Sequence, residues 1–268
     1  MQHVSVTFLT ACLIVLLVCP GCKKIIHVNI NNVAPQIVIA GVVTDQPGPY
    51  TVTISTTVNY TADNVFPPVS GALVIISVNG LADTLTETSA GTYTTHFITG
   101  SPGNTYSLYV AASGHVYTSS STMPQKVPLD SVGYSNSDRS NKKKINGVAY
   151  FQDPSGIANY YEFIEYNNGV QFQNDRGVSV FSDRLSDGKY ISRTLDDDST
   201  DINGGDTLTI QMNCIDANVY NYLNTLNLIT RQNSFQSPTP DNPSTNISNK
   251  ALGYFSANTV EKKSVFVR

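Results

Sequence analysis

The chain has 268 residues, of which 13% are charged, and its formal net charge is -4. This charge gives no general attraction to nucleic acid, so nucleic acid is excluded as an expected partner. Tryptophan is absent and tyrosine is abundant, while Gly, Pro, Asn and Ser recur at short intervals. Such a composition is typical of β-rich exported modules.

The N-terminal segment contains an uncharged apolar run, Val6 to Val18, followed by Cys19-Pro20-Gly21-Cys22. A membrane-spanning helix needs roughly 20 apolar residues, so this run is too short to span and instead has the length of a signal-peptide h-region. The small residue Gly21 directly before Cys22 resembles the lipobox of bacterial lipoproteins. We therefore expect a signal peptide at residues 1–21 and a lipid anchor, carrying palmitate, on Cys22.

The C-x-x-C motif has two other interpretations, an ordinary secretory signal and a redox or metal pair. A redox C-x-x-C opens a helix after a strand, because the helix N-terminus stabilises the thiolate, and no such pattern surrounds this motif. Lys23 and Lys24 follow the motif where surface-displayed lipoproteins tend to have acidic residues, so the side of the membrane stays open. Cys214, beside Met212 and Ile215, is predicted to be a small buried hydrophobe.

A short polar tether, residues 22–34, leads into a region of predicted strands over residues 35–125. The Asn79-Gly80 turn is one of the signals that separate these strands at intervals of about 8 to 12 residues. The strands are predicted at Gln36–Thr44, Tyr50–Ser55, Ala72–Val78, Leu81–Thr88, Thr92–Ile98, Thr105–Ala111 and His115–Thr122. This pattern predicts a mainly β fold with an N-terminal Ig-like or transthyretin-like β-sandwich.

The composition changes over residues 126–144, which are rich in Pro, Ser, Asn and charge, and we expect a linker there. Its run Lys142-Lys143-Lys144 is interpreted as a solvated loop rather than a site for an anionic ligand. Residues 145–268 predict a second β-rich domain. Its strands are predicted at Ile145–Phe151, Asn159–Tyr166, Val170–Phe172, Gly177–Phe181 and Thr207–Met212.

One segment of the second domain, residues 216–231, follows the helical period instead of the strand period. Asp216 is a plausible N-cap for this helix. The apolar side chains that share one face are those of Val219, Tyr222, Leu223, Leu226 and Ile229. We expect this face to pack on the second sheet, because the opposite face is polar but carries little positive charge.

The sequence offers few groups for catalysis. Beyond the tether the histidines are His96 and His115, both on predicted strands, and no G-x-S-x-G, G-x-G-x-x-G, Walker or H-E-x-x-H motif occurs. Glu162 and Glu165 would lie on opposite faces of one strand, which disfavours a shared glycosidase site. We predict no catalytic residue, no enzyme activity and no cofactor, and keep an exported hydrolase as the least supported alternative.

The loop from Asp196 to Asp206 is dense in carboxylates, which suit calcium because Ca²⁺ prefers six to eight oxygen ligands. The weak calcium candidates are Asp197, Asp198 and Asp201. Ile202 stands where an EF-hand requires Gly, and no Glu closes the loop, so a solvated acidic hairpin is the alternative. No metal is assigned on this basis.

Several tyrosines could either stack on sugars or fill the core and its rim, and sequence alone does not separate these roles. They are Tyr160, Tyr161, Tyr166, Tyr220, Tyr222 and Tyr254. They keep open a carbohydrate- or peptide-binding module as an alternative function.

Several local patterns together resemble a known family. They are PQIVIAGVVTDQPGPYTVTIS, VSGALVIISVNG, AGTY with TYSLYV, NYYEF, DGKY and NPSTNISNKALGYFSA. This set, from Cys22 to about Ala257, resembles the Bacteroidota lipoproteins catalogued as domain of unknown function 4249. The resemblance implies an outer-membrane lipoprotein with an N-terminal β-sandwich, often encoded beside a TonB-dependent transporter, and implies no catalytic residue. We therefore expect an accessory or binding component of such an uptake system.

Overall fold

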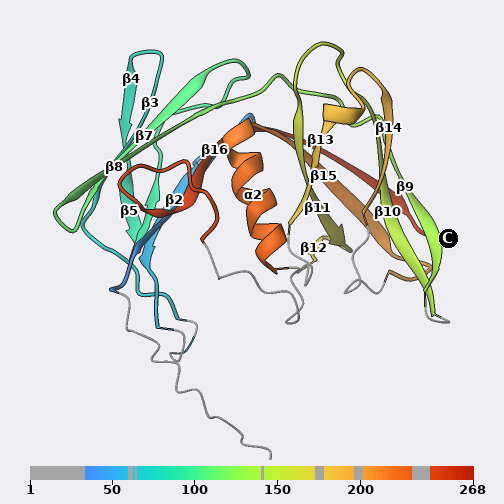
Figure 1. Cartoon of the computed structure of the whole chain (residues 1–268), viewed down its shortest axis with the longest axis horizontal. Helices are drawn as coiled ribbons and strands as arrows, with labels where there is room; N and C mark the ends of the chain where they lie inside the picture. Colours follow the sequence, from blue (N-terminus) through green and yellow to red (C-terminus); the bar gives the residue numbers. More distant parts are fainter. Residues whose placement is uncertain are drawn as a thin grey trace, which may run out of the picture. The chain divides into compact units, whose positions relative to one another are not determined.

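The computed structural model describes residues 34–59, 63, 65–139, 142–172, 178–195, 202–230 and 242–268. Pro35–Arg268 forms one compact unit. Its described residues form three β-sheets, one α-helix and one short 3-10 helix (Figure 1). The predicted mainly β fold class is confirmed.

The first sandwich is made by the strands of residues 35–125, as predicted, together with part of a distant strand. One of its sheets contains β1 (Ile37–Thr44), β2 (Thr51–Thr56), β6 (Thr92–Thr94) and β5 (Thr86–Ser89). The other contains β4 (Leu81–Thr84), β3 (Leu73–Val78), β7 (Thr105–Ala112) and β8 (His115–Thr122). Side chains alternate along these strands, so Ile39, Val52, Ile76 and Tyr106 are fully buried in one core between the sheets.

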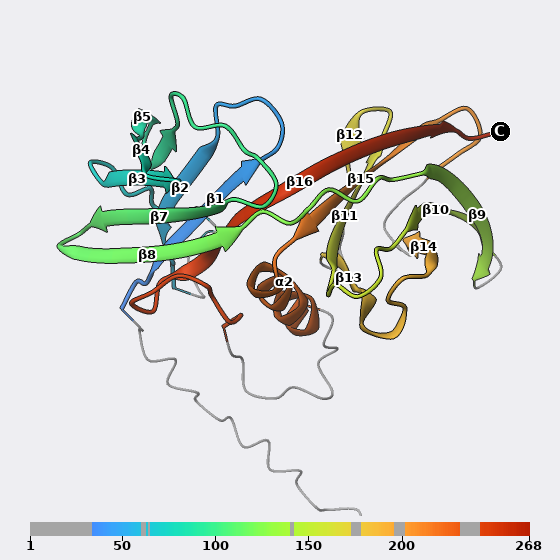
Figure 2. The ribbon, with the colours of Figure 1, turned by 90° about the horizontal axis from the view of Figure 1, so that it is seen from above.

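Strand β16 (Leu252–Phe266) belongs to two regions of the molecule, and the sequence did not predict it. Its first half pairs in parallel with β1, from Val38 opposite Leu252 to Thr44 opposite Asn258. From Thr259 onward it pairs antiparallel with β15 (Thr207–Ile215). Figure 2 shows this strand running from the first sandwich into the second. The nine-stranded sheet therefore continues through both regions in the order β12-β11-β15-β16-β1-β2-β6-β5, with β13 on β11.

The second sandwich packs the far half of that sheet against a three-stranded sheet. The first half-sheet contains β11 (Tyr160–Asn167), β12 (Val170–Gln171), β13 (Ser179–Ser182), β15 and β16, and the other sheet contains β14 (Tyr190–Leu195), β10 (Lys142–Gln152) and β9 (Ser131–Arg139). Phe151 and Tyr161 meet in its core with ring centroids 4.8 Å apart. Cys214 is buried there, as predicted, and burial raises the pKa of its thiol.

The segment predicted as a linker, residues 126–144, contains β9 and the first residues of β10 instead. Val127 and Leu129 are each 1% exposed and belong to the second core, so this stretch is part of the sandwich despite its polar composition. Lys142-Lys143-Lys144 accordingly lies in β10, paired with β9, and the solvated-loop prediction is wrong. The mostly polar sequence of β9, after a Pro-rich, charged stretch, gave too weak a period to predict a strand.

Helix α2 (Ala217–Thr230) confirms the predicted helix. The Asp216 carboxylate accepts the backbone N–H groups of Asn218 at 2.8 Å and Val219 at 2.9 Å, as an N-cap does. Val219 and Leu223 are buried against aromatic side chains of β11 and β16. The apolar face thus lies on the sheet, as expected. No helix in the described ranges has the length and apolar character needed to cross a membrane.

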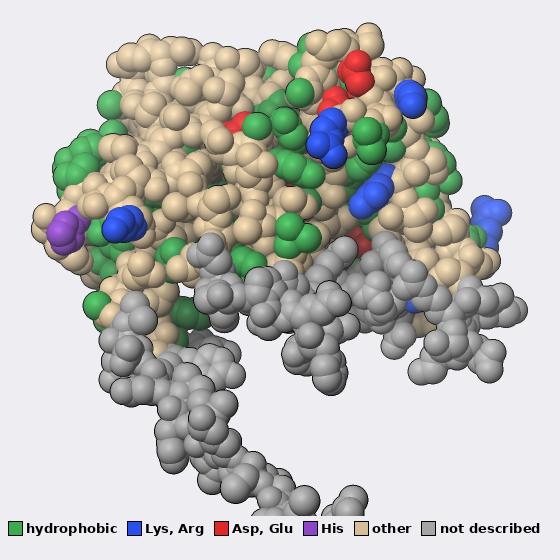
Figure 3. All heavy atoms as spheres, in the orientation of Figure 1, with side chains coloured by type: hydrophobic (Ala, Val, Ile, Leu, Met, Phe, Trp, Pro, Cys, Tyr) green, Lys and Arg blue, Asp and Glu red, His purple; other side chains and the backbone are tan. Residues whose placement is uncertain are grey.

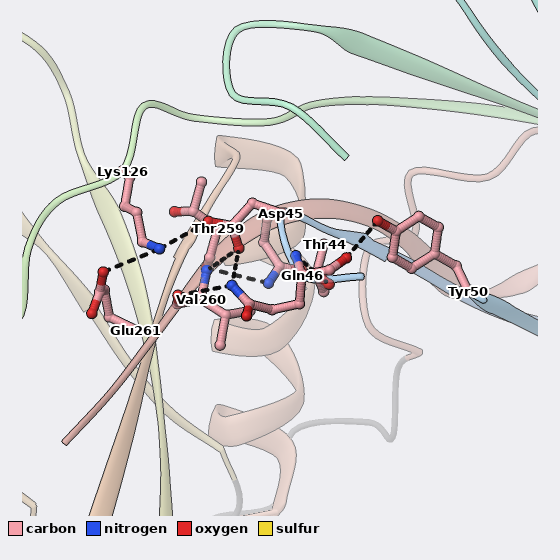
Figure 4. A network of polar contacts seen from close by, with 9 residues as sticks. Thr44, Asp45, Gln46, Tyr50, Lys126, Thr259, Val260 and Glu261 are labelled. Carbon is pink, nitrogen blue, oxygen red and sulfur yellow. Dashed lines mark hydrogen bonds and ion pairs between the residues drawn. The ribbon is translucent and has the colours of Figure 1, made fainter. Parts of the chain in front are cut away.

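A polar network joins the connection between the two sandwiches to β16 (Figure 4). The Lys126 ammonium lies 3.0 Å from an Asp45 carboxylate oxygen and 3.1 Å from one of Glu261. The other oxygen of Asp45 accepts the Val260 N–H at 2.9 Å. Asp45 follows β1 and Lys126 follows β8. The network therefore connects the segments after these two strands to β16.

Candidate functional site

The predicted lipid and calcium residues lie outside the described residues. These are Cys22 in the N-terminal segment, and Asp197, Asp198 and Asp201 in the acidic loop. The end of that loop is described: the Asp206 carboxylate accepts bonds from the Asn203 N–H and from the side-chain amides of Asn167 and Asn168. These bonds lower the pKa of Asp206 and close the turn before β15.

His96 is part of a structural loop in the first sandwich. Its Nδ1 lies 2.9 Å from Asp83, and its Nε2 lies 2.9 Å from the Thr86 hydroxyl. Asp83 is fully buried and accepts the backbone N–H groups of His96, Phe97 and Ile98. Burial alone would raise the pKa of Asp83, but these bonds outweigh it, so the pKa is lowered.

The side chains of Asp83, His96 and Thr86 contact one another in series, as the acid, base and nucleophile of a catalytic triad do. Thr86 lies on β5 at the end of the nine-stranded sheet and is exposed. An acyl-transfer site also needs N–H donors for an oxyanion, and the nearby N–H groups of residues 96–98 already bond Asp83. We therefore assign these three residues a structural role.

Glu162 and Glu165 lie on opposite faces of β11, as predicted. The Glu162 carboxylate accepts the Asn213 side-chain amide at 2.9 Å, and burial raises its pKa against the effect of that bond. Glu165 is buried on the inner face, where a Cβ added to Gly147 would lie 2.5 Å from its carboxylate oxygen. The two carboxylates therefore do not form a shared catalytic pair.

An acidic cluster that the sequence did not predict joins Asp153, Asp183 and Asp187. One carboxylate oxygen from each lies within 4.8 Å of the others, which is the spacing that a metal ion needs. Each carboxylate also accepts bonds from the protein, including one from the Tyr161 hydroxyl to Asp153 at 2.6 Å and one from the Asn159 N–H to Asp183 at 2.8 Å. Burial and the neighbouring carboxylates raise the pKa of Asp183.

This acidic cluster fixes two turns beside each other. Asp153 begins the D-P-S-G turn and also accepts the Gly188 N–H at 3.0 Å, in the D-G-K-Y turn. Asp183 is buried at the start of the 3-10 helix η1 (Asp183–Leu185), and Arg184 and Leu185 after it are exposed. The cluster therefore presents these two side chains to solvent. Asp beside Pro or Gly was the sequence signal for the turns, but not for their contact.

One candidate binding surface is a hollow of about 800 Å³ between α2, β13 and β14, which we call the groove. Figure 3 shows basic and hydrophobic side chains side by side on this face of the molecule. Tyr160 and Tyr220 meet there with ring centroids 4.9 Å apart, and Tyr190 is 56% exposed. Polar side chains add hydroxyl and amide groups to the groove: Ser182, Ser186, Ser192, Asn221 and Asn224.

The tyrosines proposed from sequence separate into distinct roles. Tyr160 and Tyr220 line the groove, whereas Tyr161 is fully buried in the second core. Tyr222 on α2 packs against Tyr254 on β16, with ring centroids 4.9 Å apart. Sequence reasoning missed Tyr190, since β14 was not predicted.

The segment with the pattern NPSTNISNKALGYFSA, one of those that resemble the family, has a structural role. The Asn246 side chain accepts the Phe255 N–H at 3.0 Å and donates to the Phe255 carbonyl at 2.7 Å, as a neighbouring strand would. Ser248 bonds the backbone of Thr118 on β8. Residues 245–248 therefore connect β16 to β8 by hydrogen bonds. A second hollow of about 670 Å³ lies beside residues 245–248, and none of its described lining residues has a charged side chain.

The model of a family described as Domain of unknown function (DUF4249) matches residues 23–264. No curated protein matches the chain.

Proposed function

Since the chain belongs to the DUF4249 family, whose description names no function, we propose from the geometry that it is a membrane-tethered binding protein with its ligand site in the groove. The groove carries this proposal. Three tyrosine rings, two arginines and several hydroxyl and amide groups converge there from β11, β13, η1, β14 and α2. Concave sites that combine aromatic walls with a few convergent polar groups are typical of ligand binding.

The tether is proposed from the N-terminal sequence. A lipid on Cys22 would confine the binding unit to a membrane surface, where weak contacts gain from high effective concentration. The resemblance to outer-membrane lipoproteins supports this location and a TonB-dependent transporter as the partner. The alternative is a carbohydrate- or peptide-binding module that works without a transporter, and a hydrolase remains less supported because no described residues form a complete catalytic set.

The groove is tested with Tyr190→Ala, because Tyr190 is largely exposed and its loss should leave the fold intact. Tyr109→Ala is the matched control: Tyr109 is 37% exposed and lines the second hollow. Affinity gel electrophoresis of the full chain against a panel of polysaccharides should show retardation that Tyr190→Ala removes and Tyr109→Ala keeps. Retardation that depends on Tyr109 instead would place the site in the second hollow, and unretarded migration in every gel would contradict glycan binding.

The tether and partner need separate experiments. The wild type should incorporate labelled palmitate and stay with membranes after a salt wash, and Cys22→Ala should lose both properties. Absence of label in the wild type would contradict lipidation. Purification of the native protein in mild detergent should retain an outer-membrane barrel, and isolation without such a partner would contradict the transporter association.

A further inference from the structure

The groove is basic in a protein of net negative charge. Among the described residues that line it, Arg184 and Arg193 are charged and none is acidic. The whole chain has a formal net charge of -4. Because a concave surface of one sign favours ligands of the opposite sign, this local reversal indicates an anionic ligand.

The two arginines are held differently. The guanidinium carbon of Arg193, on β14, lies 5.4 Å from the centre of the Phe181 ring on β13, a cation–π contact. Arg184 is exposed in η1, and none of the ion pairs among the described residues involves it. One arginine is therefore positioned by the protein, while the other keeps its charge available to a ligand.

The chemistry of these groups indicates a carboxylate on a sugar ring. A guanidinium offers a planar set of donors that matches a carboxylate in a bidentate manner. Tyrosine rings provide flat apolar surface with a polar tip, which suits a sugar ring. The serine and asparagine side chains of the groove supply further donors and acceptors for hydroxyl groups.

We propose that the groove binds an acidic polysaccharide, with Arg184 contacting the carboxylate of a uronic acid and Tyr190 packing against the sugar ring. This inference rests on the proposed function, because it names the ligand class of the same groove. An acidic peptide could also pair with the arginines, but it would leave the hydroxyl and amide lining with less to bind. We therefore treat a peptide as an outcome of the test.

The test compares polygalacturonate with the same polymer after methyl esterification, which removes the negative charge and keeps the sugar ring. The full chain in detergent should be retarded by the acid form and at least about tenfold less by the ester, as expected when a charge-assisted bond is lost. Arg184→Gln should weaken binding to the acid form by a similar factor. Arg184→Lys should lie between, because it keeps the charge and loses the planar donors.

Lys263→Gln is the matched control, since it removes the same charge from an exposed position on β16 outside the groove. It should bind like the wild type, and an equal loss would show nonspecific attraction and overturn the proposal. Equal retardation by acid and ester, both lost in Tyr190→Ala, would overturn the anionic ligand while keeping the groove as a binding site. Binding of poly-glutamate but of neither polymer would overturn the glycan, and binding of no probe would contradict the acidic ligand class as a whole.

Discussion

The two sandwiches bury carboxylates in opposite ways. In the first, Asp83 accepts three backbone N–H groups and a contact from the His96 ring, and its pKa falls below its ordinary value of 3.8. In the second, Glu162 accepts one amide, Asp183 lies beside two other carboxylates, and burial raises both pKa values. Burial alone therefore does not decide which protonation state is stable; the hydrogen-bond donors and charges around the carboxylate also do.

This difference gives Asp83 a pH dependence opposite to that of Glu162 and Asp183. The lowered pKa of Asp83 contributes stability that is present above its unfolded pKa near 3.8 and is lost as pH falls through the folded value. The raised pKa values of Glu162 and Asp183 mean that their folded forms retain protons longer than the unfolded forms. These groups destabilise the fold above their folded pKa values, and stability recovers as pH falls through them.

The largest effect is expected from Asp83→Ala, which leaves the buried loop N–H groups without their acceptor. We expect a loss of about 3 kcal/mol in the free energy of unfolding, because each unsatisfied buried donor costs about 1–3 kcal/mol. Urea unfolding followed by circular dichroism measures it. Asp83→Asn keeps an acceptor oxygen and should lose less, while also removing the stability change below about pH 4 that follows from Asp83 protonation. An Asp83→Ala variant as stable as the wild type would show that the loop does not depend on this carboxylate.

The junction between the two regions is tested by Asp216→Ala. Asp216 caps α2 and also accepts a hydrogen bond from Ser121 on β8, so it links the helix to the first sandwich. Loss of an N-cap costs about 0.5–2 kcal/mol, and we expect the free energy of unfolding to fall by that amount, seen as a lower midpoint of urea unfolding. Asp216→Asn retains a good cap and should stay within about 0.5 kcal/mol of the wild type. An unchanged midpoint in the alanine variant would mean that sheet packing alone holds the helix.

Glu162→Gln tests the carboxylate of the second sandwich whose pKa burial raises. The change removes a charge that burial disfavours and leaves an oxygen to accept the Asn213 amide. Stability near neutral pH should stay the same or rise by about 1 kcal/mol, as happens when a poorly compensated buried charge is removed. Thermal unfolding at a series of pH values should show the gain shrinking as pH falls. A clear loss at neutral pH would mean that Glu162 has a charge partner in the folded protein.

Lys126→Met should have the smallest effect, although Figure 4 shows Lys126 between two carboxylates. Its side chain is 35% exposed, so solvent and salt screen the pairs with Asp45 and Glu261. We expect a loss of about 0.5 kcal/mol at low salt, which should shrink at high salt. The measurement is the urea midpoint at two salt concentrations. A salt-independent loss of several kcal/mol would show that this network is as tightly held as the Asp83 loop.

The parts of the fold that follow a local period were predictable. The β-branched run of β1, the alternation in β2, the Asn79-Gly80 turn and the Asp216-capped helix all depend on neighbouring residues, and all are present. Strand β16 was not predictable, because Phe255 to Val260 are buried on both faces and include Ser256, Asn258 and Thr259, so no alternation marks them. Their burial depends on partners far away in the sequence.

The candidate site was harder to predict for the same reason. The tyrosines in N-Y-Y-E-F and on α2 were identified, but the groove also needs Arg184, Arg193 and Tyr190 from a turn and a strand that alternate weakly. The position of Arg184 follows from the acidic cluster, whose members come from turns 30 residues or more apart, as in the bond from Gly188 to Asp153 with a separation of 35. Contacts of this kind have no local signature.

The shared strand β16 also determines when, during synthesis of the chain, the sheet of the first sandwich can be completed. The bond between Asp45 and Val260 spans 215 residues, so β1 has no parallel neighbour until nearly the whole chain has been synthesised. Folding of such non-local contacts is slow, and an unpaired strand edge can pair with other chains in the meantime. A fragment ending at residue 125 would keep that edge open permanently, so expression of the first sandwich alone should yield aggregates rather than a soluble module.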